Sequence, residues 1–384
     1  MAEPVTDTSR NQIAVLADDT AARLAHIWQK FLGVESIGHD QNYFDLGGDS
    51  SLAVQMFAEI EKTFGVKLPL ATLYDAPTIE ELAHIVRGEA SASGWSPLVA
   101  IQPMGARPPI FCMHPHGGNV LVYRDLSRHL GPDQPFYGLQ CQGLDGDLRP
   151  LKTIQAMATL YVKEIQKVQP HGPYFLGGYC MGGTIAFEVA QQLHAKGEET
   201  ALLTLFDTIE CSSFQLPSFW AQSYYNGQRL LFHVANFLSL DSEGRNRFLR
   251  DKMRTLRSRA TVWGGTLLWR IRRNSSGDRS ESWVLGQIWQ ANFQACLDYV
   301  PQPYSGTFTE FRPARQYRMF TGPDMKWDRF ARGKQEVVVL PVNAPAMLIE
   351  PFVKDLAIEV RRRMDTVMKT PATSQSQESL AKSL

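Results

Sequence analysis

Apolar and polar residues follow a helical period over roughly the first ninety residues of the chain. Apolar side chains recur every three or four positions over residues 21–31, after an acidic stretch at residues 18–20 that would cap a helix, and Gly33 would end it. The same spacing predicts helices over residues 51–64 and 78–86. This part of the chain therefore predicts a small helical domain.

From about residue 97 the pattern changes to short apolar runs that alternate with helical segments. Such runs are typical of buried strands, and their alternation with helices predicts a mostly parallel sheet. The predicted strands cover residues 110–113, 135–139, 173–176, 202–206, 308–311 and 337–340. Helices are predicted over residues 153–168 and 183–195.

These changes of pattern divide the chain into five segments. A Gly/Ser/Ala-rich stretch separates the helical part from the α/β part and is typical of a linker. The predicted segments are an N-terminal tail at 1–17, a helical domain at 18–88, a linker at 89–96, an α/β domain at 97–367 and a disordered tail at 368–384.

Composition and charge exclude several classes of protein. The 384 residues contain no apolar run near the roughly 18 residues of a membrane span, and the polar N-terminus is no signal peptide. The five cysteines are scattered, which indicates a reducing compartment and excludes a cysteine-rich metal site. The net charge is zero, although residues 1–90 hold six basic against fourteen acidic residues. We expect a soluble, cytoplasmic protein that binds neither nucleic acid nor membrane.

A reactive cysteine is predicted where the strand at 173–176 ends. The run Gly178-Tyr179-Cys180-Met181-Gly182 has the G-x-nucleophile-x-G form of a nucleophile elbow, in which glycines flank a sharp turn that exposes one side chain. Asp207 follows the next predicted strand, 27 residues later, and gives the nucleophile-then-acid order of α/β-hydrolases. The alternatives are a buried structural cysteine and a loop-capping aspartate.

A second motif lies in the helical domain. In the run Leu46-Gly47-Gly48-Asp49-Ser50, the residues by themselves indicate a helix N-cap after a flexible turn. The whole of residues 20–87, however, resembles the carrier (thiolation) domains of nonribosomal peptide and polyketide synthases. That resemblance implies a four-helix fold in which Ser50, rather than the neighbouring Ser51, carries a 4′-phosphopantetheine arm.

The α/β domain is similar to the terminal thioesterase domains of the same synthases over nearly its full length. The resemblance implies catalysis by Cys180 and Asp207, with backbone N–H groups of Met181 and of His114, His116 and Gly117 as the oxyanion hole. It also implies a helical lid at about 210–300. Two interpretations of the aromatic residues in this segment stay open: they line an acyl path, or they pack between helices. Two also stay open for its basic run at 245–273: a docking face, or a solvated helix face.

The sequence departs from the family at the catalytic histidine. The flanking residues match, but Ala344 stands at the histidine position, and the last histidine of the chain is His233. A solvated histidine is the favoured interpretation of His116 and His233, and a structural one of His114, although each is a candidate base. A thiol is partly ionised near neutral pH, so Cys180 could still accept an acyl group without a histidine.

These features predict a carrier–thioesterase didomain of natural-product biosynthesis. The acyl thioester on Ser50 would pass to Cys180 and then to an amine or another acceptor. One alternative is an active carrier beside a catalytically silent thioesterase-like domain that binds or gates the acyl group. The other is an editing or releasing hydrolase with a displaced base. The expected partners are a phosphopantetheinyl transferase, a separate acyl-activating or upstream synthase protein and a small-molecule acceptor, with no metal.

Overall fold

A computed structural model describes most of the chain in several ranges. These are residues 7–48, 50–90, 95–144, 149–208, 281–315, 327–343 and 346–369, with the single positions 223, 227, 231, 234, 237 and 245. The chain divides into two compact units, residues 1–95 with 218–284 and residues 96–217 with 285–384. Each unit is described by itself.

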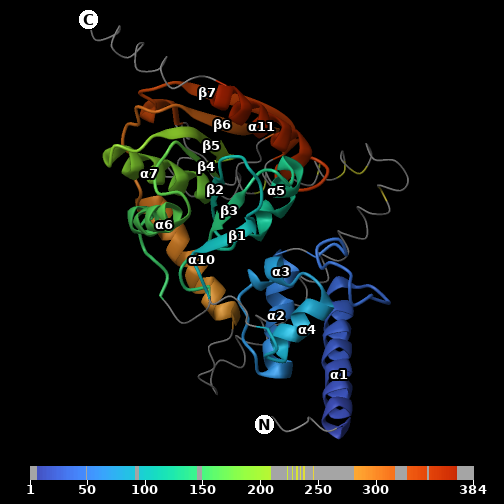
Figure 1. Ribbon diagram of the computed structural model, residues 1–384. Coiled ribbons are helices and arrows are strands. Elements are labelled where there is room, and N and C mark those ends of the chain that lie inside the picture. Colours follow the sequence, from blue (N-terminus) through green and yellow to red (C-terminus); the bar gives the residue numbers. More distant parts are fainter. Residues whose placement is uncertain are drawn as a thin grey trace, which may run out of the picture. The chain divides into compact units, whose positions relative to one another are not determined.

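Four helices form the described part of the first unit. They are α1 (Asp7–Leu32), α2 (Ser50–Phe64), α3 (Thr72–Asp75) and α4 (Ile79–Val86) (Figure 1). Fully buried side chains such as Leu24, Trp28 and Ile60 form its core. The Trp28 indole meets the Tyr43 ring edge-on, with ring centroids 5.3 Å apart. The predicted helical domain is confirmed.

The first helix begins earlier than its sequence predicts. We expected a start at residues 18–20, but α1 is already helical from Asp7. Residues 7–20 contain neither glycine nor proline, so nothing in the sequence stops the helix there. Its predicted end is confirmed, because Gly33 adopts a φ of 67° and its N–H donates to the Gln29 carbonyl over 2.8 Å.

The fourth helix begins with a capping box. The Thr78 hydroxyl accepts from the Glu81 N–H over 3.2 Å, and the Glu81 carboxylate accepts from the Thr78 N–H over 3.1 Å. This reciprocal pair satisfies donors that a helix start otherwise leaves free.

A seven-stranded sheet forms the centre of the second unit. Its strands lie in the order β1-β3-β2-β4-β5-β6-β7, with β1 antiparallel to β3 and all other pairs parallel. The strands are β1 (Leu98–Gln102), β2 (Ile110–Met113), β3 (Phe136–Leu139), β4 (Tyr174–Tyr179), β5 (Thr200–Phe206), β6 (Phe308–Arg315) and β7 (Gln335–Asn343). Because the carboxyl ends of parallel strands share one edge, the loops after β2, β4 and β5 meet there.

Helices cover both faces of this sheet. In Figure 1, α6 (Ile154–Val168) and α7 (Met181–Ala195) lie on one face, and α5 (Arg124–Leu130) and α11 (Val353–Lys369) lie on the other. The helix α10 (Glu281–Asp298) follows the residues predicted as a lid, and short 3₁₀ turns occur at Leu121–Tyr123 and Trp327–Phe330. No described helix combines the length and apolarity needed to cross a bilayer.

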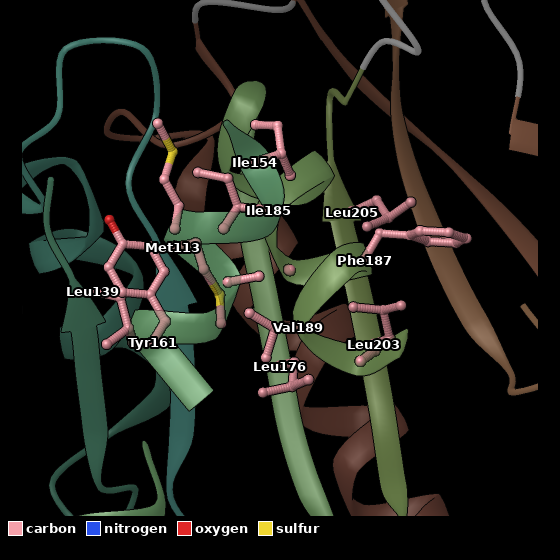
Figure 2. Packing of buried hydrophobic residues seen from close by; sticks show 14 of the residues in the cluster. Met113, Leu139, Ile154, Tyr161, Leu176, Ile185, Phe187, Val189, Leu203 and Leu205 are labelled. Carbon is pink, nitrogen blue, oxygen red and sulfur yellow. The ribbon is translucent and has the colours of Figure 1, made fainter. Parts of the chain in front are cut away.

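The core of the second unit lies between the sheet and the α6–α7 layer. Figure 2 shows Tyr161 and Ile185 among side chains of β2, β4 and β5, including Met113, Leu176 and Leu203. These side chains are all fully buried, and burial of each contributes roughly 2 kcal/mol to the stability of the fold. This packing holds β4 and α7 rigidly on either side of the turn at Cys180.

The predicted strands all occur, and β4, β5, β6 and β7 extend beyond their predicted ends. The apolar cores of β6 and β7 were predicted, but both strands continue into polar residues because ladder hydrogen bonds do not require apolar side chains. The strand β1 and the helices α5 and α11 were not predicted. The last of these ends at Lys369, two residues beyond the predicted end of the domain.

Candidate active site

The turn between β4 and α7 has the backbone of a nucleophile elbow. Cys180 follows the last strand residue and precedes the first helical one, with φ 55° and ψ −122°. Residues other than glycine rarely adopt this backbone conformation, which costs about 1–3 kcal/mol. The turn is held by the Cys180 N–H, which donates to the Phe206 carbonyl of β5 over 2.9 Å. The half-buried thiol therefore stands at the carboxyl edge of the sheet.

Glycines flank the elbow because backbone segments touch there. A Cβ at Gly178 would collide with the backbone of Gly182, and a Cβ at Gly182 would collide with the Met113 carbonyl oxygen of β2. The α7 N-terminus can approach β2 this closely only without side chains. The predicted glycine pattern is thus explained by contacts of the turn itself.

A buried tyrosine ties the ends of β2 and β4 together. The Tyr123 hydroxyl donates to the Met113 carbonyl and accepts from the Tyr179 N–H, the latter over 2.8 Å. Tyr123 is fully buried, and burial raises the pKa of its hydroxyl. It fixes the spacing between the elbow and the loop that follows β2.

The predicted oxyanion donors differ in whether their N–H groups already donate a hydrogen bond within the protein. The His114 N–H donates to Leu139 over 2.9 Å, so it is not available to a substrate. In contrast, no described residue accepts from the N–H groups of Met181, His116 or Gly117. The Met181 N–H is also at the first position of α7, where the helix dipole favours negative charge. These three groups remain candidates, and the His114 N–H does not.

His114 is a structural residue of the loop after β2. Its ring is fully buried, stands edge-on to Tyr161 with centroids 5.9 Å apart, and its Nδ1 lies 2.8 Å from the Pro115 carbonyl oxygen. Burial lowers the pKa of His114 to about 4. The imidazole is therefore neutral at physiological pH and inaccessible to solvent.

His116, two residues later, contacts the predicted nucleophile. Its Nδ1 lies 3.5 Å from the Cys180 Sγ. The ring also lies beside two aromatic side chains of α10, at 6.0 Å from Trp289 and 6.1 Å from Phe293 between centroids. These two rings stack on each other at 5.3 Å with an interplanar angle of 13°. His116 is held in an aromatic corner beside the thiol and is not a solvated histidine.

The helix α10 also fixes the backbone of the His116 loop. The Asn292 amide is fully buried and donates from Nδ2 to the His116 carbonyl over 2.9 Å. A thiol from Cys141 donates to the Asn292 Oδ1 over 3.7 Å. Just past the helix end, the Tyr299 hydroxyl donates to the Glu188 carboxylate of α7 over 2.8 Å. Thus α10 is tied to α7 at one end and to the loop after β2 at its middle.

Charge on neighbouring thiols acts on the His116 imidazole. Burial lowers the pKa of His116, whereas hydrogen bonds and charge from Cys180 and Cys296 raise it, with a net rise to about 10. Cys296 is a buried residue of α10. The sulfur neighbours therefore favour the protonated form of the imidazole. Among the described residues, no group of three or more side chains is arranged to hold a metal ion.

Asp207 occupies the other side of the elbow. It follows β5 directly, has a φ of 44°, and its N–H donates to the Phe311 carbonyl over 2.9 Å. Burial and the nearby Glu310 carboxylate raise its pKa to about 7. Within the described ranges, no hydrogen bond reaches the Asp207 carboxylate. An aspartate that orients an imidazole has such a bond.

The position of the missing histidine falls just outside the described residues. Strand β7 ends at Asn343, and Ala344 and Pro345 are not described. Val342 is buried in the strand. An alanine at position 344 has no group that could bind the Asp207 carboxylate or accept a proton.

The predicted attachment residue, Ser50, is the first residue of α2. The turn before it contains Gly47, at a φ of 85°, and Gly48, where a Cβ would collide with the buried Tyr43 ring. A phosphodiester on a serine at this place is favoured by the N–H groups and dipole of the helix start, and the first turn of α2 contains no acidic residue. The residues present therefore fit the group. The placement of Asp49 is outside the described residues.

Most of the predicted lid is outside the described residues. This applies to the aromatic residues at 219–232 and to nearly all of the basic run at 245–273. Arg245 is described, and its Nε donates to the Phe237 carbonyl over 3.2 Å while its guanidinium lies 5.8 Å from that ring centroid. The expected acyl path and docking face remain predictions.

Comparison with known families agrees with both halves of the chain. Residues 22–86 match the phosphopantetheine attachment site family, and residues 108–265 match the thioesterase domain family. The chain is a carrier domain followed by a type I thioesterase domain. Its second unit thus has the α/β-hydrolase fold, and its first unit is a phosphopantetheine carrier.

Similar sequences occur within much longer synthetases and synthases. The chain is 42% identical over 187 residues to malpinin synthetase of Mortierella alpina, covering 48% of this chain and 2% of that protein. It is 30% identical over 380 residues to chondramide synthase of Chondromyces crocatus, covering 94% of this chain and 9% of that protein. The chain thus spans a small part of these relatives.

A solved structure supports the same fold. A holo four-domain nonribosomal peptide synthetase bound to AMP and glycine aligns with a TM-score of 0.55 and 25% identity. The alignment covers 92% of the carrier–thioesterase chain and 26% of the solved one.

Sequence reasoning missed the contribution of α10. Asn292, Cys296 and Tyr299 lie on the buried face of this segment with Ile288, at spacings of three or four residues. A polar Asn on an otherwise apolar helix face is a usable signal, because a buried amide must find partners. The spacing could have suggested that this helix contacts a loop of the catalytic edge.

Proposed function

We propose that the chain transfers an acyl group from the carrier domain to Cys180 and releases it to an amine or a related acceptor. The setting is natural-product biosynthesis of the nonribosomal peptide or polyketide type. The backbone of the elbow is the observation that carries the proposal, because it presents a thiol beside free N–H groups at the start of α7.

Ser50 is the proposed attachment residue on the carrier domain. The phosphopantetheine group supplies, when bound, a long arm whose terminal thiol holds acyl groups as thioesters. A phosphopantetheinyl transferase is the partner that would attach it. An acyl-activating or upstream synthase protein is the partner that would load it.

Cys180 is the proposed nucleophile, and the backbone stabilises the charge that develops. As its sulfur bonds to a thioester carbonyl carbon, the carbonyl oxygen gains negative charge. The N–H groups of Met181 and of His116 or Gly117 are the proposed donors, each worth a few kcal/mol in the transition state. Exchange of one thioester for another is nearly thermoneutral, so the acyl group can move to Cys180 without an added energy source.

The absence of a histidine at position 344 favours amines over water at the release step. Water is a weak nucleophile and needs a base to remove its proton. A neutral amine attacks with its own lone pair. With Ala344 at the family's base position, an amine acceptor is the one that the site can still use well.

Hydrolysis is the second candidate, and the His116 contact favours it. An imidazole 3.5 Å from the nucleophile is a possible base for water once Cys180 is acylated. This function would make the chain an editing or releasing thioesterase. The two candidates differ only in the acceptor, so one experiment separates them.

The test follows the acyl group by mass. The holo carrier, loaded with an acyl group on Ser50, is digested with trypsin after defined times, with and without an added amine. Residues 31–62 form one tryptic peptide that contains Ser50, and residues 168–196 form another whose only cysteine is Cys180. The matched controls are Cys180→Ala, and the pair Ser50→Ala and Ser51→Ala.

The expected result is an acyl mass that moves from the first peptide to the second and is lost faster with amine. Loss at the same rate with water alone would establish hydrolysis instead. An acyl group that stays on the Ser50 peptide with every acceptor would overturn both and leave a carrier beside a silent domain.

A further inference from the structure

We propose that His116 is the imidazole partner of Cys180 and takes the proton-transfer role that the family assigns to a histidine at position 344. The pair lies on the opposite side of the elbow from Asp207. The proposal depends on the proposed function only in treating Cys180 as the nucleophile.

Geometry is the first support. His116 Nδ1 lies 3.5 Å from Cys180 Sγ, within hydrogen-bond range for sulfur. No other described imidazole contacts Cys180, since the His114 ring lies 5.9 Å from Tyr161 and binds the Pro115 carbonyl. Of the two histidines in this loop, only His116 is aimed at the elbow.

Orientation of the ring is the second support. A catalytic imidazole is held in place by neighbours, commonly by a carboxylate on its second nitrogen. Here the neighbours come from α10. Asn292 holds the His116 carbonyl, and the stacked rings of Trp289 and Phe293 flank the imidazole. Trp289 itself is 50% exposed.

Charge is the third support. The described titratable groups around His116 are Cys180 on the elbow, Cys296 on α10 and His114 on the same loop. Burial acts to lower the pKa of His116, yet the two thiols raise it to about 10. The neutral His114 adds no repelling charge at physiological pH, since its pKa is lowered to about 4. The two thiols therefore favour the protonated form of His116.

The proton movements of the pair balance over both half-reactions. The thiol proton of Cys180 passes to His116 Nδ1, and the thiolate bonds to the thioester carbonyl carbon. The bond from that carbon to the departing sulfur breaks, and the departing thiolate takes the Nδ1 proton. In the second half, the acceptor attacks acyl-Cys180, its proton passes to Nδ1, and Cys180 leaves as a thiolate. No oxidant or further reactant is required.

The test measures the reactivity of Cys180 without any acyl substrate. The full-length protein is alkylated with iodoacetamide from pH 5.5 to 9.5, and the label on the tryptic peptide 168–196 is quantified. His116→Gln keeps a hydrogen-bonding side chain of similar length but cannot be protonated. His129→Gln is the matched control, because His129 lies in the same unit and binds Glu350 at the surface.

The wild type should alkylate at pH 6.5 at nearly its alkaline rate. A free thiol is only about 1% ionised at that pH, so His116→Gln should be at least about tenfold slower there and equal to the wild type above pH 9. Convergence at high pH is the signature of a lost proton partner, which a distorted site would not show. His129→Gln should follow the wild type.

Two outcomes would overturn the pairing. One is a His116→Gln profile that coincides with the wild type. The other needs no variant: a wild-type rate that rises about tenfold per pH unit up to about pH 8.5 is that of an unassisted thiol. If the alkylation result holds while acyl transfer to Cys180 fails, the pair exists and the proposed function is wrong. The reverse result would remove His116 and leave the proposed function intact.

Discussion

The two sides of Cys180 differ in a way that neither side shows alone. On the side of β5, Asp207 keeps the strand-end position and unusual φ of a catalytic acid, yet no described group binds its carboxylate. On the side of β2, His116 contacts the thiol and is held by α10, yet no carboxylate supports it. One side has an acid without a base, and the other has a base without an acid.

The difference shows how a thiol relaxes the demands on a catalytic site. A serine hydroxyl must lose its proton during attack, which requires a well-oriented base and the acid behind it. A thiol loses its proton at a far lower pH and needs only a partner that stabilises the thiolate. Under our proposal, His116 serves this purpose without a carboxylate, and Asp207 is not required.

Substitution of the proposed nucleophile should have the largest effect on acyl transfer. Cys180→Ser should reduce acyl transfer to position 180 by more than about 10³-fold, because an alcohol needs a base that is supported by an acid, and neither side combines the two. The measurement is the single-turnover appearance of acyl mass on peptide 168–196. Cys112→Ala, which removes a buried thiol of β2, is the control and should transfer normally. Efficient transfer to serine would mean that a complete base system exists.

A histidine at position 344 should give the Asp207 side of Cys180 a base, as the His116 side already has. Ala344→His gives Asp207 a partner, and a positioned base commonly contributes about 10²-fold, so hydrolysis of acyl-Cys180 should rise by about that factor. The readout is the rate at which water removes the acyl group when no amine is present. Ala344→Gln has a polar side chain but no base, and it should hydrolyse no faster than the wild type. An unchanged rate in Ala344→His would show that Asp207 no longer orients an imidazole.

Loosening the α10 contact should weaken the His116 side selectively. Asn292→Ala leaves the His116 carbonyl without its donor, and loss of one such bond costs about 1 kcal/mol, or roughly fivefold in a rate that depends on ring position. Alkylation of Cys180 at pH 6.5 measures this effect. Gln294→Ala removes an exposed side chain that binds Asp298 on the same helix and should have no effect. A larger loss from Gln294→Ala than from Asn292→Ala would contradict the assignment.

Removing the unused acid should have the smallest chemical effect. Asp207→Asn should change acyl transfer less than about threefold, whereas an orienting aspartate is worth about 10⁴-fold in a complete triad. Its effect on stability depends on pH. The folded-state pKa of Asp207 is raised to about 7 from an ordinary 3.8, so the folded protein retains a proton that the unfolded chain has lost.

The sign of that effect follows from proton binding. Between about pH 4 and pH 7 the folded state holds more protons, so stability falls as pH rises and stays low above pH 7. Asp207→Asn lacks this fall, and its free energy of unfolding should exceed that of the wild type by a few kcal/mol at pH 8 and by little at pH 4. Urea unfolding at both pH values measures the difference. An equal difference at both pH values would exclude titration of Asp207 as the cause.

The elbow and its strand could be predicted because their signal is local. Gly178 and Gly182 are required by collisions within the turn, and Cys180 follows an apolar run that only a buried strand explains. The cap of α4 is local in the same sense, since Thr78 and Glu81 satisfy each other. Contacts of this kind involve residues that are close in sequence, so they can be predicted from the sequence alone.

The role of His116 could not be predicted because its neighbours are distant in sequence. Its position in the loop after β2 was evident, but its partners lie 64 residues later at Cys180 and 176 residues later at Asn292. From sequence alone, His114 is interpreted as a structural histidine and His116 as a solvated one, and each is only a candidate base. Only the packing of the loop against α10 turns one ring into the core and the other toward the thiol.

Because of the way α10 is attached, a small tilt of this helix changes the distance between His116 and Cys180. The helix is tied to α7 at Tyr299, and it contacts His116 through Trp289, ten residues earlier. At 1.5 Å per residue, this is a lever of about 15 Å, and a tilt of about 4° about Tyr299 would move the Trp289 end by about 1 Å. The gap between imidazole and thiol is 3.5 Å, so such a tilt is enough to couple or uncouple the pair. The distance between His116 and Cys180 is therefore set by the angle at which α10 packs, and not by the loop after β2 alone.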